Sequence, residues 1–453
     1  MARQRREGPT IENIMGQLHK DKVRFIHLQF TDVLGVVKSV TIPVEQFGDC
    51  MERGKWFDGS SVDGLARILE SDMYLKPDLS TLAVLPWERN ADESSARVIC
   101  WVLTPQGETF TGDPRTALMR VMEEAAEMGY QFRTAPELEF FLFSPGEGGC
   151  MTPLRQDRGG YFDLGTGPTA VVRKEMVKAL QDIGIQVETS HHEIAVGQHE
   201  IDLTPQPAIT SSDNLITCRY TLRAIAQRHG LDVTFMPKPL LEMEGSGLHI
   251  HQSLFFIDNN HNAFADPQDE YGLSTIARHF IAGLLHHAPG MSALLCPLVN
   301  SYKRLVPGFE APVHITWARV NRSALIRVPL VNPQKRETTR VELRNPDPSC
   351  NPYLAFAAML KAGLHGIRDE MPLPPPVEES LFAMDAGELQ RRHISAVPGT
   401  LGEALDALRR DQVVQEALAE PLYTKFLEAK AREWEDYRRY VTPWEIDHYL
   451  GVW

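Results

Sequence analysis

The first hundred residues switch repeatedly between the apolar spacing of a helix and the alternation of a strand. A helical series begins after Thr10, a residue type that favours helix N-termini. The alternating stretches that follow are typical of half-buried strands, and turn residues between the first two predict a hairpin. Together they predict a small α+β domain. The predicted elements are helices over 10–20 and 43–53 and strands over 23–30, 36–42 and 97–103, within a domain covering 1–104.

The remaining residues, 105–453, predict a larger α/β domain in which strands and helices alternate. After a turn-rich linker, its first helix is predicted to begin with Asp113 as N-cap and Pro114 at the first helical position. Further on, Thr400 and Glu403 have the spacing of a capping box.

The chain is predicted to finish with a helical tail over 426–453 that is rich in aromatic residues. Such a tail is more favourable against a partner subunit than in water, so we expect a homo-oligomer. Its aromatic residues are Trp434, Tyr437, Tyr440, Trp444, Tyr449 and Trp453.

Composition narrows the possible partners. The 453 residues are 43% hydrophobic and 23% charged, with no apolar run of transmembrane length. A net charge of −14 argues against nucleic acid as a partner and gives no attraction to anionic membranes. Six cysteines without CxxC spacing are typical of reduced thiols. We therefore expect a cytoplasmic protein.

Acidic residues gather in three segments that have few cations to balance them. Residues 191–200 contain Glu193 and Glu200. Residues 136–143 read as a buried strand whose two acids, Glu137 and Glu139, share one face because side chains alternate. The third segment, 245–251, adds His249 and His251. Buried carboxylates on one face require a cation, and an oxygen-rich set with one imidazole suits Mg²⁺ or Mn²⁺ better than zinc.

Basic residues are grouped further along, in segments 300–312, 321–327 and 340–344. Arginine forks match carboxylate and phosphate oxygens. Metal carboxylates together with arginines, in a chain that has no Walker motif, suggest phosphoryl transfer from a nucleotide bound in some other way.

At this point the sequence resembles type I glutamine synthetase over nearly its whole length. The matching motifs are FDGSS (57–61), PELEFFLF (136–143), GGYFD (159–163), HHEIAVGQHEID (191–202), KPLLEMEGSGLHIHQS (238–253), NSYKRLVPGFEAP (300–312), NRSALIR (321–327) and RVELRNPDPSCNPYL (340–354). The resemblance implies a β-grasp domain followed by a catalytic domain, assembled as a dodecamer of two hexameric rings. It implies ligation of ammonium to L-glutamate through γ-glutamyl phosphate, with ATP as co-substrate.

The resemblance also implies two metal ions per active site, and it assigns roles by motif position. Glu139, Glu193 and Glu200 would hold one ion, and Glu137, His249 and Glu342 the other. Arg304, Arg344, Glu244 and Gly245 would bind glutamate. Asp58, Ser61, Tyr161 and Glu193 would form the ammonium site, with Asp58 as the base. Glu310 would close a flap, while Arg322 and Arg340 would offset charge on the transferred phosphoryl group. Glu188, His251, Ser253, Arg322 and Arg327 would contact ATP. His191 and His192 are expected only to pack beside the metal strand.

Three other functions compete with this one. Residues 165–170 fit GxGxxA with Glu188 about 20 residues on, as in a dinucleotide-binding dehydrogenase, but no apolar strand precedes them. A related protein without catalysis is disfavoured because all six implied metal ligands are present. A γ-glutamylamide or γ-glutamylpolyamine synthetase, using another amine, stays open.

Several positions predict individual properties. Phe382 stands where some family members have a modifiable tyrosine, so adenylylation is not expected, and Arg67 matches an arginine tied to feedback inhibition by glutamine. Glu244 replaces the asparagine of the family's Asn-Gly-Ser-Gly loop. It predicts weaker binding of glutamate or a preference for a larger amine. Because the first domain supplies Asp58 but no metal ligand, the active site is expected to be shared between subunits.

Overall fold

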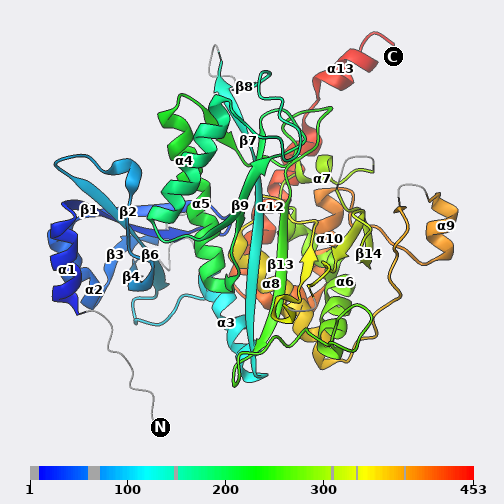
Figure 1. Ribbon diagram of the computed structural model, residues 1–453, viewed down its shortest axis with the longest axis horizontal. Helices are drawn as coiled ribbons and strands as arrows, with labels where there is room; N and C mark the ends of the chain where they lie inside the picture. The colour runs from blue at the N-terminus through cyan, green and yellow to red at the C-terminus, as the bar shows by residue number, and fades with distance from the viewer. Residues whose placement is uncertain are drawn as a thin grey trace.

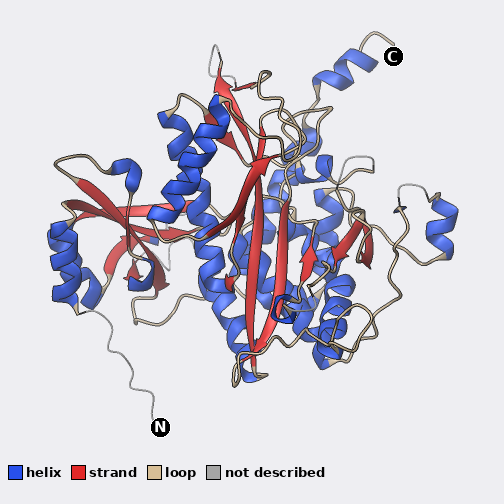
Figure 2. Cartoon of the chain, in the orientation of Figure 1, coloured by secondary structure: helices blue, strands red, loops and turns tan. Residues whose placement is uncertain are grey.

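The computed structural model describes residues 10–59, 72–146, 151–307, 311–332, 335–381 and 384–452. Figure 1 shows the N-terminal domain, in blue, beside a larger domain, with the C-terminal helix projecting from the top of the larger domain. Figure 2 shows long strands running through the middle of the larger domain with helices around them.

The N-terminal sheet has the order β2-β1-β6-β4-β3, with β5 paired to β6. β1 and β2 form the predicted hairpin, and β1 also runs parallel to β6. Thr10 caps the first helix by accepting from the amide of Asn13, as predicted. Apolar side chains from both helices and the sheet form a separate core. The elements are α1 (Ile11–Lys20), β1 (Val23–Thr31), β2 (Val37–Pro43), α2 (Phe47–Arg53), β3 (Lys55–Asp58), β4 (Asp72–Pro77), β5 (Ala83–Val84) and β6 (Ser94–Leu103).

The larger sheet has the order β14-β15-β16-β13-β7-β10-β9. Its longest strand, β7 (Tyr130–Pro145), lies between β13 (Leu248–Phe256) and β10 (Gln198–Leu203) and is antiparallel to both. β7 contains the strand predicted over 136–143, and it is almost wholly buried there. The other strands are β8 (Met151–Pro153), β9 (Val187–His192), β11 (Gln206–Pro207), β12 (Asp232–Thr234), β14 (His314–Ala318), β15 (Ala324–Arg327) and β16 (Val341–Leu343).

Helices pack around this sheet. Asp113 caps the first of them by accepting from the amide of Arg115, as predicted. Gly283 and Gly366 allow two buried helices to touch, because a Cβ at either position would collide with the backbone of the other helix. The helices are α3 (Pro114–Glu127), α4 (Pro168–Asp182), α5 (Ala208–Arg228), α6 (Thr275–Leu295), α7 (Ser301–Arg304), α8 (Pro352–Arg368), α9 (Ala386–Arg391), α10 (Leu401–Arg410) and α11 (Gln412–Leu418).

The tail is not one helix, which corrects the prediction over 426–453. It divides into α12 (Leu422–Arg439) and α13 (Pro443–Tyr449). Thr442 and Glu445 form a capping box that begins α13, a signal readable in the sequence. The capping box predicted at Thr400 is only half formed, because the carboxylate of Glu403 accepts from the amide of Gly399 instead.

The tail's aromatic residues fall into two groups. Trp434 packs against the core of the larger domain, whereas Tyr440, Trp444 and Tyr449 are exposed. Among the described residues, no helix is long and apolar enough to cross a membrane.

Candidate active site

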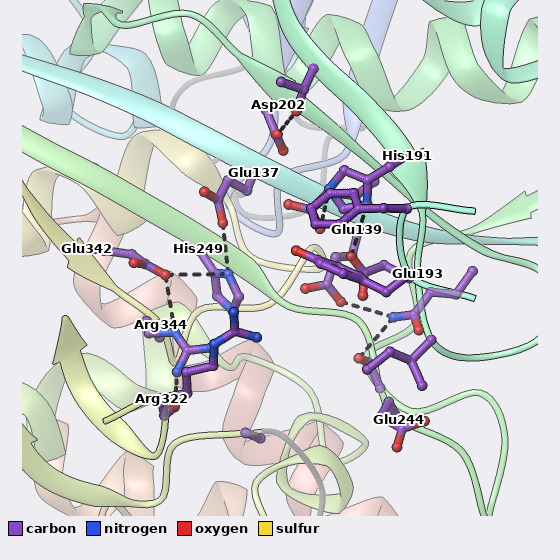
Figure 3. Close-up of a pocket in the computed structure, with 18 of the residues that line it drawn as sticks. Glu137, Glu139, His191, Glu193, Asp202, Glu244, His249, Arg322, Glu342 and Arg344 are labelled. Carbon is purple, nitrogen blue, oxygen red and sulfur yellow. Dashed lines mark hydrogen bonds and ion pairs between the residues drawn. The ribbon is translucent and has the colours of Figure 1, made fainter. Parts of the chain in front are cut away.

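One cavity of about 510 Å³ brings the predicted acidic segments together. Glu137 and Glu139 both reach it from β7, as alternation along that strand requires (Figure 3). Glu200 reaches it from β10, while Glu193 lies just beyond the end of β9. All six residues predicted as metal ligands line this cavity: Glu137, Glu139, Glu193, Glu200, His249 and Glu342.

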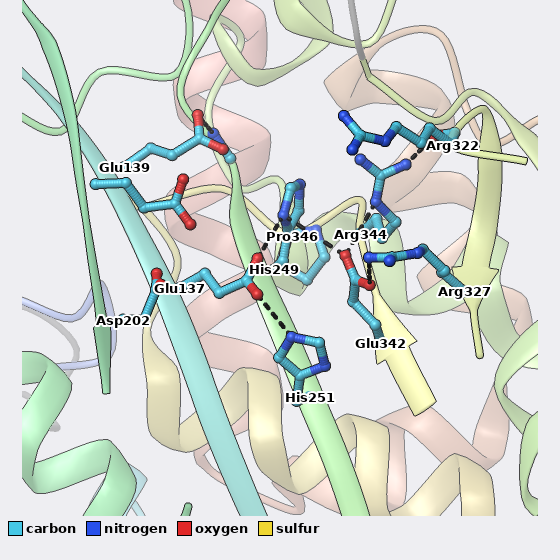
Figure 4. A network of polar contacts seen from close by, with 12 residues as sticks. Glu137, Glu139, Asp202, His249, His251, Arg322, Arg327, Glu342, Arg344 and Pro346 are labelled. Atoms are coloured by element: carbon cyan, nitrogen blue, oxygen red, sulfur yellow. Dashed lines mark hydrogen bonds and ion pairs between the residues drawn. The ribbon is translucent and has the colours of Figure 1, made fainter. Parts of the chain in front are cut away.

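Strand register brings Glu137, His249 and Glu342 together across the sheet. Glu137 on β7 is opposite His249 on β13, and Glu342 on β16 is opposite His251. Nδ1 of His249 lies 2.9 Å from Glu137 and 3.7 Å from Glu342. Nε2 of His251 lies 2.6 Å from the other oxygen of Glu137. We call Glu137, His249 and Glu342 the balanced cluster (Figure 4).

Cations of the chain already surround the balanced cluster. Nη1 of Arg327 donates to one oxygen of Glu342 at 2.9 Å, and Nε of Arg344 donates to the other at 3.1 Å (Figure 4). Burial opposes ionisation of Glu137, but hydrogen bonds from His249 and His251 hold its pKa well below the ordinary range. Burial likewise opposes ionisation of Glu342, yet nearby positive charge keeps its pKa low. Both carboxylates are therefore ionised at neutral pH.

Glu139, Glu193 and Glu200 form the second group, which we call the repulsive cluster. Burial, followed by the negative charge of Glu139, raises the pKa of Glu200 far above its ordinary value. Burial is also the main cause of the raised pKa of Glu193. Within the described residues, only His191 makes an ion-pair contact with either acid, at 3.3 Å from Glu193 and 3.8 Å from Glu200. One histidine does not balance three buried carboxylates.

Both clusters suit hard divalent cations. The ligand atoms of the balanced cluster all lie within 4.8 Å of one another. The repulsive cluster offers carboxylate oxygens whose repulsion a bound cation would remove. Carboxylates with a single imidazole suit Mg²⁺ or Mn²⁺, as the sequence predicts.

The expected glutamate-binding residues lie on one side of the same cavity. Arg304 is buried and donates to the carbonyls of Arg344, Asn345 and Pro346, at 3.2, 2.9 and 3.3 Å. A Cβ on Gly247 would lie 2.6 Å from Nη2 of Arg304 and 3.2 Å from Glu139, so a larger residue there would displace the guanidinium. The loop that carries Gly247 therefore passes directly between the arginine and a candidate metal ligand.

Glu244 and Gly245 complete this side. The carbonyl of Gly245 accepts from Nε2 of Gln198 at 3.2 Å, and the same amide donates to Glu139 at 3.0 Å. Glu244 lines the cavity and is half-buried, but Figure 3 shows its carboxylate turned away from Glu193. Burial lowers the pKa of Lys238, and the negative charge of Glu244 counteracts part of this shift.

Tyr161, Arg322, Arg327 and Arg344 also line the cavity, as predicted. The ring of Tyr161 packs edge-on against His191, with centroids 5.0 Å apart. Burial, together with the charges of Glu193 and Glu200, raises the pKa of Tyr161 to about 12. Its hydroxyl is thus a hydrogen-bond donor at neutral pH.

Other predicted residues lie outside the cavity lining. Asp58 is exposed on β3, and Glu188 is exposed on β9. His251 lies behind Glu137 and accepts at Nδ1 from Arg340 at 3.3 Å, while Ser253 is farther along β13. Ser61 and Glu310, like Arg67 and Phe382, fall outside the described residues.

Eight lining residues were not predicted, and three of them, His191, Gln198 and Asp202, lie beside the predicted acids. Gln198 and Asp202 share a face of β10 with Glu200, so alternation alone could have found them. His191 was expected only to pack beside the strand. It is opposite Glu200 on the neighbouring strand and contacts two acids, because its side chain faces the cavity whereas His192 faces the other way.

Comparison with known proteins decides the family. The model of the glutamine synthetase catalytic domain matches residues 111–449, and that of the glutamine synthetase beta-Grasp domain matches residues 22–105. The chain belongs to the glutamine synthetase family.

Individual relatives from named organisms support the same family. Glutamine synthetase of Thermus thermophilus is 48% identical over 98% of this chain and all of its own length. That of Thermotoga maritima is 47% identical over 97% of this chain and 99% of its own.

Solved structures extend the likeness to the fold. An ADP complex of GmaS has a TM-score of 0.86 at 30% identity and covers 97% of this chain and 99% of its own. Glutamine synthetase of Plasmodium falciparum has a TM-score of 0.86 at 25% identity and covers 98% of this chain and 99% of its own.

Membership confirms two predictions. The fold is α+β, with an N-terminal β-grasp domain followed by a larger catalytic domain. The chain is a ligase that makes glutamine from glutamate and ammonia with ATP, and like its family it depends on metal ions.

Proposed function

We propose that this cavity carries out both steps of glutamine synthesis. The γ-carboxylate of L-glutamate attacks the γ-phosphorus of ATP, giving γ-glutamyl phosphate and ADP. Ammonia then attacks the acyl carbon and phosphate leaves. The observation that carries the proposal is the convergence of all six candidate metal ligands on one cavity that arginines also line.

Two divalent cations, Mg²⁺ or Mn²⁺, would be held by the two clusters. When bound, they would neutralise phosphate oxygens and so reduce repulsion against the attacking carboxylate. Around them the chain supplies fixed positive charge: Arg322 and Arg327 line the cavity, and Arg340 lies behind His251. We assign Arg322 and Arg340 to the transferred phosphoryl group, and Glu188, His251, Ser253, Arg322 and Arg327 to ATP.

Arg304 and Arg344 are proposed to orient glutamate, together with the carbonyl of Gly245. Arg304 is held by backbone carbonyls and Arg344 by Glu342, so both guanidiniums have fixed positions. Fixed guanidiniums would hold the substrate glutamate in one orientation. Asp58, Ser61, Tyr161 and Glu193 are proposed to bind ammonium, and Asp58 to accept the proton that leaves free ammonia. Glu310 is proposed to exclude water from the acyl phosphate.

An oxygen-labelling experiment tests the first step. Glutamate labelled with ¹⁸O in its γ-carboxylate is incubated with ATP, ammonium and Mg²⁺, and the released phosphate is analysed by mass spectrometry. One labelled oxygen should appear in phosphate, because the carboxylate oxygen that attacked phosphorus leaves with it. Unlabelled phosphate formed at the rate of glutamine would exclude the acyl phosphate.

An amine panel tests the second step. The named relatives favour ammonia, whereas the carboxylate of Glu244 in the cavity lining justifies comparing alkylamines and polyamines. We expect kcat/KM to be highest for ammonium. A higher value for a larger amine would instead support the γ-glutamylamide synthetase.

We further propose a dodecamer of two hexameric rings in the cytoplasm, with the domain boundary between residues 104 and 105. Exposed aromatic residues on α13 and an exposed Asp58 outside the cavity support a site that neighbouring subunits complete. Asp58→Ala and Glu310→Ala variants, each inactive, should regain part of the activity when unfolded and reassembled together. Mixed oligomers that assemble but stay inactive would contradict a shared site.

A further inference from the structure

A buried hydrogen-bond network lies on the face of the β9–β10 hairpin that points away from the cavity. His192 and His199 are opposite each other on the two strands, and both are buried. Nε2 of His199 lies 3.0 Å from the carboxylate of Asp157, and Nε2 of His192 lies 3.5 Å from it. Asp157 also accepts from the hydroxyl of Thr169, at 2.8 Å.

Two histidines and an aspartate are a possible metal site, but Arg173 argues against one. Its Nη1 lies 2.8 Å from Nδ1 of His199. Arginine can only donate, so Nδ1 accepts and the ring proton is on Nε2, pointing at Asp157. A metal on Nε2 would need that proton removed or moved to Nδ1, where the arginine stands. The network is therefore a hydrogen-bond support.

Asp157 holds the hairpin in a second way. Its carbonyl accepts from the amide of Gly197, at 3.1 Å, in the turn between the strands. Gly197 has φ of 72° and packs on the carbonyl of Leu142, so glycine is required and the turn cannot easily rearrange. One residue thus fixes both the strands and the turn of the hairpin that carries Glu193 and Glu200.

Asp157 also begins the loop that carries Tyr161 across the cavity. Gly159 in this loop packs on the ring of His192, where a Cβ would lie 2.9 Å from the ring carbon. Tyr161 then packs on His191 from the cavity side. The hairpin is held between the network on one face and this loop on the other.

We propose that Asp157 is a positioning residue that sets the geometry of Glu193 and Glu200, acting through His199, Thr169 and the Gly197 turn. The inference rests on the proposed function for the roles of those two carboxylates. Partners behind metal ligands commonly change metal affinity by 10- to 100-fold when altered. Glu137, His249 and Glu342 reach the cavity from β7, β13 and β16. The network and the turn meet β7 at Phe140 and Leu142, farther along that strand than Glu137, so the balanced cluster should be affected less.

Asp157→Asn tests the inference. The amide keeps the shape of the carboxylate, but its nitrogen cannot accept a hydrogen bond. The variant side chain can therefore no longer accept from both Thr169 and His199. The measurement is a Mn²⁺ titration of the full-length protein without substrates, with free Mn²⁺ followed by electron paramagnetic resonance. We expect one of two binding phases to weaken about 10-fold and the other to stay within twofold. The KM for ammonium should rise while the KM for ATP changes little.

Glu175→Gln is the matched control. Glu175 is an exposed acid on α4 that pairs with His229 at 2.8 Å, so the change removes the same charge from an acid–histidine pair elsewhere. It should leave both Mn²⁺ phases unaltered. If Asp157→Asn does not fold, Thr169→Val removes one donor to Asp157 and should weaken the same phase less.

Two outcomes would overturn the inference: both Mn²⁺ phases weakening together, or neither changing. Failure of the proposed function looks different, since wild-type protein would then bind Mn²⁺ in two phases without forming glutamine.

Discussion

The two acidic clusters lie side by side in one cavity, yet the chain treats them in opposite ways. In the balanced cluster, Arg327, Arg344 and two histidines keep Glu137 and Glu342 ionised. In the repulsive cluster, burial and mutual repulsion raise the pKa of Glu193 and Glu200. The balanced cluster is therefore stable without an added cation, whereas the repulsive cluster destabilises the fold until a cation binds.

Glu200→Gln should have the largest effect. It removes a ligand from the repulsive cluster, so one Mn²⁺ phase should be lost and activity should fall by roughly 100-fold or more. The metal-free variant should nevertheless be more stable than wild type at neutral pH, because folding no longer has to keep protonated a buried carboxyl that is ionised in the unfolded chain. Denaturant melts in a chelator test this. A variant that is less stable without metal would contradict the contrast between the clusters.

Glu342→Ala should have the opposite effect on the metal-free protein. The side chain of Glu342 is 2% exposed, and its loss leaves Arg344 buried and unpaired. We expect a loss of about 3 kcal/mol in the free energy of unfolding, the low end for a buried pair because Arg327 is partly exposed. Glu388→Ala, which removes one of the two ion-pair partners of the exposed Arg392, is the control and should cost well under about 1 kcal/mol.

The stability of the metal-free protein should depend on pH in two opposite ways, one for each cluster. Glu193 and Glu200 have raised pKa values, so their contribution to stability is present below the ordinary value of 4.5 and is lost as pH rises above it. Glu137 and Glu342 have lowered pKa values, so their contribution is present above 4.5 and is lost as pH falls through the folded-state values.

Stability should therefore fall between about pH 5 and 8 by roughly 1 kcal/mol or more, since one pKa unit corresponds to ~1.4 kcal/mol. Saturating Mg²⁺ should flatten this decline, and so should Glu200→Gln. Chemical denaturation across the pH range, with and without chelator, provides the measurement. If Mg²⁺ leaves the decline in stability unchanged, the decline does not come from the repulsive cluster.

Glu244→Asn should have the smallest effect. The carboxylate is turned away from Glu193 and interacts with the positive charge of Lys238, so we expect about 1 kcal/mol, or roughly a fivefold lower KM for glutamate. The KM for ATP should stay nearly unchanged. Steady-state kinetics would identify Glu244 as a bystander if neither constant moved.

Much of the local structure followed from short sequence patterns. The caps at Thr10 and Asp113 formed as predicted, because each depends on one side chain and an amide two or three residues away. The break in the tail at Thr442 had the same kind of signal and was missed. Alternation along β7 correctly put Glu137 and Glu139 on the cavity side.

By itself, the sequence determined the family, many of the local elements and the residue types that gather at the site, since these rest on residue types at fixed local spacing. Only the tertiary structure decided which acids became balanced and which repulsive. That outcome depends on register between strands far apart in the chain, which pairs Glu137 with His249 and Glu139 with Glu200. It also decided that His191 faces the cavity while His192 supports the hairpin from behind. Alternation separates two neighbouring residues, but only packing of the whole sheet determines which face becomes the site.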